Sequence, residues 1–133
     1  MRRPPAAVIA FVAWTEIVWA GRVRNVMATA GWTAGDFVLP VMFVLLGLGV
    51  TALFVAPTPP AVRVAAIRGA AAVTTVVWVV RVGFIAVHDH PAAFIAVHVA
   101  LAVVSIALAA WAARSVVPNA PRVGDGRGDT ATI

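Results

Sequence analysis

The stretch Phe37–Ala56, FVLPVMFVLLGLGVTALFVA, contains 20 residues and no charged side chain. As a helix rising about 1.5 Å per residue, it spans about 30 Å, which is the thickness of the hydrocarbon core of a bilayer. Asp36 stands directly before it as a potential N-cap. The run PTPP at 57–60 follows, where a helix cannot continue. The stretch therefore predicts a transmembrane helix over about 37–56.

Three further apolar segments accompany this helix, over about 6–21, 64–87 and 92–113. Each is continuously apolar, whereas a transmembrane β-strand has about ten residues of alternating character. Only helices and closed barrels satisfy every backbone group in lipid. We therefore predict an all-α fold, a bundle of four transmembrane helices over residues 1–114. The tight turn near Asp89 makes the last two helices antiparallel neighbours.

The end of the chain differs in composition from the four segments. Residues 115–133 contain Pro118, Pro121, three Gly and charges of both signs. Such a segment cannot bury enough apolar surface to fold. We predict a disordered cytoplasmic tail.

The overall composition narrows the functional classes. The 133 residues are 62% hydrophobic and only 11% charged, against about 25% charged in soluble domains. The net charge of +5 comes from Arg without any Lys. Because these Arg flank apolar segments, we expect the lipid bilayer and not nucleic acid as their partner. The absence of Cys excludes disulfides, thiolate metal sites and thiol redox chemistry. The Ala, Val and Arg bias suggests a bacterial source.

The distribution of Arg predicts the orientation. With the N-terminus inside, two Arg lie outside, Arg22 and Arg24, Arg81 lies within the membrane, and seven lie inside: Arg2, Arg3, Arg63, Arg68, Arg114, Arg122 and Arg127. Positive charge concentrates on the cytoplasmic side of membrane proteins. We predict a multi-pass protein of the bacterial cytoplasmic membrane with both termini in the cytoplasm.

Glu16, Arg81 and His98 form a predicted polar layer within the membrane. Glu16 and Arg81 lie five and six residues before the predicted ends of parallel segments, so their depths should match. Each charge costs about 2.5–3.5 kcal/mol at mid-membrane, which favours mutual compensation. We expect an ion pair between them, with neutral His98 bridging Arg81 to Ser105 or to a backbone carbonyl. Two interpretations stay open: a structural ion pair that fixes helix order, or a substrate or proton site.

The remaining polar and aromatic residues predict no further site. The motif His88-Asp89-His90 could hold a metal only with a third ligand, and we expect a solvated turn there. Trp19 and Trp32 are expected at one membrane interface. We expect no metal and no cofactor, and no catalytic residues, because there is no evident nucleophile, metal set or phosphate loop.

Three short motifs occur between Leu45 and His98: LLGLG at 45–49, RVG at 81–83 and His90-Pro91 before the last segment. This half of the chain resembles small DoxX-like four-helix membrane proteins of bacteria. The resemblance implies a link to membrane-associated redox complexes, although the chain has no Cys for a thiol-linked role.

The sequence Trp14-Thr15-Glu16-Ile17 in the first segment supports a second resemblance. It is similar to the small multidrug resistance transporters, four-helix proteins with one essential carboxylate in the first helix. The resemblance implies that role for Glu16. The third segment lacks the glycine-rich packing pattern of that family, and Arg81 would neutralise the carboxylate.

These observations predict an accessory or interaction subunit of a membrane complex, without catalysis of its own. Its partner would be another membrane protein or a second copy of the chain. The alternative is a small proton-coupled transporter that uses Glu16. A transporter needs a water-accessible cavity that reaches Glu16, whereas an accessory subunit needs an exposed seam of small residues.

Overall fold

The computed structural model describes residues 3–116, and these residues form four helices and no strand. The helices are α1 (Ala6–Met27), α2 (Gly35–Val55), α3 (Pro60–Ala86) and α4 (Ala92–Ser115). The all-α prediction is therefore confirmed for this part of the chain. All but the first two residues of the predicted tail, 115–133, lie outside the described residues.

The largest difference from the predicted boundaries is at the end of α1. The helix was expected to end near residue 21, but it continues for six further residues to Met27. Arg22 and Arg24 lie on this extension and are exposed. Long Arg side chains can place their charge at the membrane surface while their stems remain on an apolar helix, so they need not end it.

The start of α2 is held by Thr33 and Asp36 in a way that differs from the prediction. Asp36 lies inside the first turn and is not the N-cap, which is Ala34. The backbone N–H and the hydroxyl of Thr33 both donate to Asp36 Oδ2, at 2.8 and 2.9 Å. This is the reach-back arrangement of a capping box, in which an acidic side chain satisfies a donor just before the helix.

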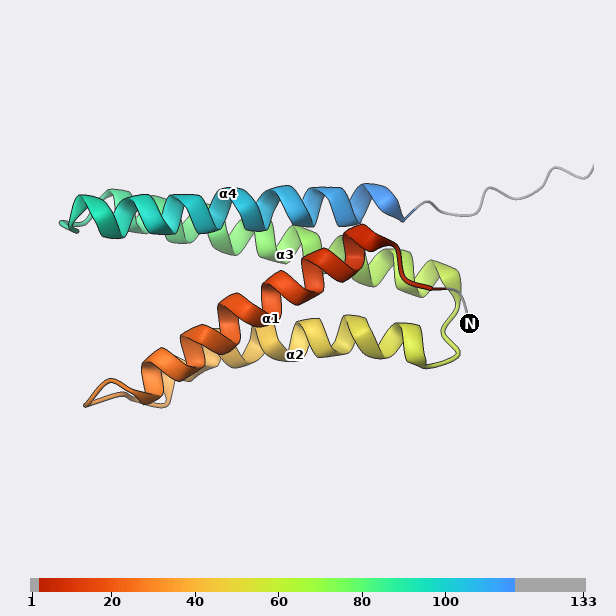
Figure 1. Ribbon diagram of the computed structural model, residues 1–133, viewed down its shortest axis with the longest axis horizontal. Coiled ribbons are helices and arrows are strands. Elements are labelled where there is room, and N and C mark those ends of the chain that lie inside the picture. Colours follow the sequence, from red (N-terminus) through yellow and green to blue (C-terminus); the bar gives the residue numbers. More distant parts are fainter. Residues whose placement is uncertain (1–2, 117–133) are drawn as a thin grey trace, which may run out of the picture.

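The four helices form two hairpins, α1–α2 and α3–α4. Further contacts join α1 to α4 and α2 to α3, so α1 and α3 lie diagonally across the bundle. The hairpins meet near the α2–α3 turn and diverge toward the other two loops, residues 28–34 and 87–91 (Figure 1). We call the end with these two loops the open end, and the opposite end the closed end.

Small residues bring the helices together at the closed end. The buried cluster there consists of Val8, Phe11, Val50, Ile67, Ala70, Ala71, Ala109, Ala112 and Val116. Four of its nine members are Ala on α3 and α4. Small side chains let helix backbones approach closely, which gives van der Waals packing where lipid removes the hydrophobic driving force.

An aromatic cluster ends the packed region toward the open end. Trp19 stacks on Phe43 with ring centroids 4.4 Å apart, and its ring lies 6.0 Å from that of Trp78. These side chains come from α1, α2 and α3, so they join the two hairpins. Trp19 was expected at the membrane interface, but it is only 3% exposed. Its ring therefore packs inside the bundle, and its depth at the interface stays a prediction.

The outer surface is strongly apolar. All four helices are long and apolar enough to cross a membrane. Many large apolar side chains face outward, among them Ile17, Leu45 and Val80, each more than 60% exposed. Contiguous apolar surface on this scale is unfavourable in water and favourable in lipid. The chain is a multi-pass membrane protein.

Candidate functional site

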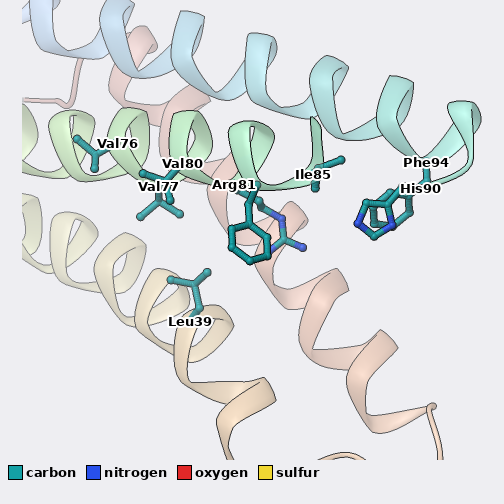
Figure 2. Close-up of a pocket in the computed structure, with 9 residues that line it drawn as sticks. Leu39, Val76, Val77, Val80, Arg81, Ile85, His90 and Phe94 are labelled. Carbon is teal, nitrogen blue, oxygen red and sulfur yellow. The ribbon is translucent and has the colours of Figure 1, made fainter. Parts of the chain in front are cut away.

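Two clefts lie at the open end, where the hairpins diverge. The α1-side cleft, about 610 Å³, is lined by residues of α1, α3 and α4. The α2-side cleft, about 540 Å³, is lined by Leu39 of α2 and by residues of α3, α4 and the turn between them. Figure 2 shows the α2-side cleft, with Leu39 across from the α3 side chains.

Arg81 lines both clefts. Its guanidinium projects from α3 into the space between the hairpins (Figure 2). Arg22 lines the α1-side cleft as well. No carboxylate lines either cleft, so the charge in this part of the bundle is positive.

Arg22 and Arg81 occupy matching positions on their helices. Arg22 lies five residues before Met27, the last residue of α1, and Arg81 lies five residues before Ala86, the last residue of α3. Both are therefore about 7.5 Å from the ends of their helices at the open end. The polar layer predicted from the sequence did not include Arg22, because α1 was expected to end at residue 21.

The structure does not bring Glu16 to Arg81. Glu16 packs instead against Gly47 of α2, where its Oε1 atom is buried without a hydrogen-bond partner among residues 3–116. Glu16 lies 11 residues before the end of α1, against five for Arg81 in α3. Measured from the helix ends, this is a difference in depth of about 9 Å.

His98 shares the α1-side cleft with Arg81, and of its two expected partners, Ser105 or a backbone carbonyl, it bonds to a carbonyl and not to Ser105. The Nδ1–H of His98 donates to the carbonyl of Phe94, at 2.9 Å. Ser105 Oγ instead accepts a hydrogen bond from Trp14 Nε1, also at 2.9 Å. This bond joins α1 to α4, so Trp14 and Ser105 position the wall of the cleft. Because Nδ1 of His98 is occupied, Nε2 is the ring nitrogen available in the cleft.

The His88-Asp89-His90 turn is organised by aromatic contacts. The ring of His88 stacks on Phe84 at 4.3 Å, and the ring of His90 lies 4.8 Å from that of Phe94. Phe94 in turn lies 4.0 Å from His98, so the ring of His90 in the turn and the rings of Phe94 and His98 in α4 follow one another along the chain. Within residues 3–116, no three His, Cys, Asp or Glu are arranged to hold a metal ion.

These features describe a positively charged site with apolar walls. Its cations are Arg22 and Arg81, and its walls include Trp14, Trp19, Trp78 and Phe94. Such a site can bind an anionic group attached to an apolar body. Glu16 lines neither cleft.

Comparison of the chain with models of protein families, with curated proteins and with solved structures finds no match. The resemblances to DoxX-like proteins and to small multidrug resistance transporters therefore stay sequence-based expectations. No known activity of a matching protein therefore helps to assign a function to the two clefts.

Proposed function

We propose that the chain is a non-catalytic accessory or interaction subunit in the bacterial cytoplasmic membrane. The observation that carries this proposal is a row of small residues on the exposed surface of α3. The row consists of Ala61, Ala65, Gly69 and Ala72, and all four are exposed. We call it the α3 seam.

The spacing of the α3 seam suits contact with another helix. Its members are separated by four, four and three residues, so they follow one face of α3. A Cβ added at Gly69 would meet no atom within 4 Å, which leaves the position open to a neighbour. Rows of small residues allow transmembrane helices to approach closely, and their backbones to make van der Waals contact. The partner is another membrane protein or a second copy of the chain.

We propose a cytoplasmic location for both termini. The closed end contains Arg3, Arg63, Arg68 and Arg114, whereas the loop region of the open end has Arg22 and Arg24. The rule that positive charge stays inside favours a cytoplasmic closed end. The open end and its two clefts then face the periplasmic side. A reporter fused after Ile133 that is active only in the periplasm would contradict this orientation.

The alternative, a proton-coupled transporter that uses Glu16, has less support. A third cleft, about 390 Å³, lies at the closed end between α1 and α2. Neither it nor the two clefts of the open end is lined by Glu16. A carboxylate that cycles its proton needs a path to water. The packing of Glu16 against Gly47 favours a structural role for this residue.

Substitution of Gly69 should separate an accessory subunit from its partner. Gly69→Leu places a large side chain on the α3 seam, so we expect it to reduce co-purification of the partner about tenfold. Gly49→Leu is the matched control, because Gly49 is equally open but its neighbours one turn away are Leu45 and Leu53. The measurement is affinity purification of the full chain from its native membranes in mild detergent, with quantitative mass spectrometry.

The same purification experiment can also overturn the proposal. An accessory subunit should retain its partner with Gly49→Leu and lose it with Gly69→Leu. If no membrane protein and no second copy co-purifies, or if the two variants behave alike, the α3 seam is not an interaction surface.

A further inference from the structure

Arg22 and Arg81, the two cations at the open end, have no role in the contact proposed between the α3 seam and a partner. The α3 seam lies in the first half of α3, whereas Arg81 lies near its end. We propose that Arg22 and Arg81 bind the phosphate headgroup of an anionic phospholipid, whose acyl chains lie along the apolar walls of the two clefts. The lipid belongs to the leaflet that contains the loops of the open end.

The charges at the open end are not balanced within the described part of the chain. Residues 3–116 contain three carboxylates, Glu16, Asp36 and Asp89. Glu16 packs on Gly47, and Asp36 accepts its hydrogen bonds from Thr33. None of the three lines either cleft. Arg22 lies near enough to Asp36 for their charges to attract, whereas the charge that acts on Arg81 is that of Arg22. A bound anion would therefore supply the counter-charge that Arg81 lacks and would offset the repulsion between the two Arg.

The depth of Arg81 matches that of a lipid headgroup. α3 has 27 residues and is about 40 Å long. If it is centred on a hydrocarbon core of about 30 Å, the core ends about 5 Å before each helix end. Arg81, about 7.5 Å from the helix end, lies within about 3 Å of that boundary. Its long side chain can reach the phosphate level, and Arg22 lies at the same distance from the end of α1.

The walls of the clefts fit acyl chains. Arg81 and Phe94 line both clefts, and the other lining residues of the α2-side cleft are apolar except for His90. A headgroup on Arg81 would therefore have apolar surface on both sides. A small inorganic anion would bind the two Arg but would leave these walls uncovered. The positive charge of the site, the depth of Arg81 and the apolar walls of the clefts together favour a lipid over a free anion.

Arginine is suited to this contact because its planar guanidinium donates two parallel hydrogen bonds to phosphate. His98 lines the same cleft, but its Nδ1–H is donated to Phe94 and Nε2 of the neutral ring can only accept, so the contacts to the phosphate come from the two Arg. Anionic headgroups are recognised by basic pockets between transmembrane helices in other membrane proteins. The site of this chain is also a basic pocket between helices, with two cations, and it has an aromatic wall in addition.

The test uses the tryptophans of the cleft as reporters. Trp14, Trp19 and Trp78 line the α1-side cleft, and Trp32 and Trp111 are exposed elsewhere. The full chain with Trp32→Phe and Trp111→Phe, in zwitterionic detergent micelles, is titrated with dioctanoyl phosphatidylglycerol while tryptophan fluorescence is recorded. We expect a saturable change, with dioctanoyl phosphatidylcholine at least about tenfold weaker. Loss of a charge-assisted contact corresponds to a change of about this size.

Charge variants identify the residues that bind the headgroup. Arg81→Gln and Arg22→Gln should each weaken phosphatidylglycerol binding about tenfold, because each removes a contact to the phosphate. Arg24→Gln is the matched control, since Arg24 has the same charge at the same end of α1 but lines neither cleft. Circular dichroism shows whether each variant folds. Arg22 is exposed, so its variant tests the site even if Arg81→Gln is unstable.

Three results would overturn the proposal. Phosphatidylcholine that binds as tightly as phosphatidylglycerol would show that the headgroup charge is not recognised. Equal weakening by Arg24→Gln would show attraction to general surface charge. Saturation by inorganic phosphate at the same concentration as the lipid would show a free-anion site without use of the walls. Because the α3 seam is not involved, loss of the partner with Gly69→Leu leaves these outcomes unchanged.

Discussion

Trp19→Ala should lower the free energy of unfolding by about 3–5 kcal/mol, the usual cost of removing a buried Trp side chain. Trp19 is 3% exposed, stacks on Phe43 and contacts Trp78. Its removal leaves a cavity where three helices meet. The measurement is unfolding by sodium dodecyl sulfate in mixed micelles, followed by circular dichroism.

Trp111→Ala is the control for this experiment. Trp111 is also a helix residue, in α4, but it is 51% exposed and belongs to neither buried cluster. We expect a change of no more than about 0.5 kcal/mol, as for other exposed positions. Equal losses in the two variants would mean that Trp19 does not join the hairpins.

Gly47→Leu should destabilise the bundle by about 3 kcal/mol, the upper end of the cost of overpacking a close contact. A Cβ at Gly47 would overlap Glu16 Oε1, and the carboxyl carbon of Glu16 is also close. The end of the Glu16 side chain could move aside for one methyl group. A Leu side chain is larger and must separate α1 from α2. The same unfolding experiment measures the effect.

A double substitution shows whether Glu16 is the obstacle. Glu16→Ala removes the carboxylate, so the variant with both Glu16→Ala and Gly47→Leu should be at least about 1 kcal/mol more stable than the sum of the single effects predicts. Gly49→Leu, at an open position on the same helix, should have little effect. Strict additivity of the two substitutions would show that Glu16 does not pack on Gly47.

The sequence was sufficient to predict the helices and their order. The uncharged run at 37–56, the prolines at 57–60 and the tight turn near Asp89 each limit the chain to one local structure. The short turn also predicted α3 and α4 as neighbours, and they pack along each other. The end of α1 was not predicted, because Gly21 and Arg22 are typical of a helix end and the helix nevertheless continues.

The arrangement of the polar residues was harder to predict, because it depends on helix rotation. In a soluble protein, the apolar stripe of a helix indicates which face is buried. The helices of this chain are apolar on nearly all faces, so the pattern does not show that Glu16 faces Gly47. The predicted depth of Glu16 in the membrane was also wrong, because it was counted from the end of α1. The error in the end of α1 placed Glu16 level with Arg81, a position that Arg22 occupies instead.

The position of Glu16 is the central claim, and cysteine cross-linking tests it most directly. The chain has no native Cys, so two introduced thiols react without background. The pair Glu16→Cys and Gly47→Cys is compared with the pair Glu16→Cys and Arg81→Cys, each treated in native membranes with a short bis-maleimide. Removal of the carboxylate leaves room for the thiol at residue 47. We expect a cross-link between residues 16 and 47 and none between residues 16 and 81, and the reverse result would contradict this arrangement of the bundle.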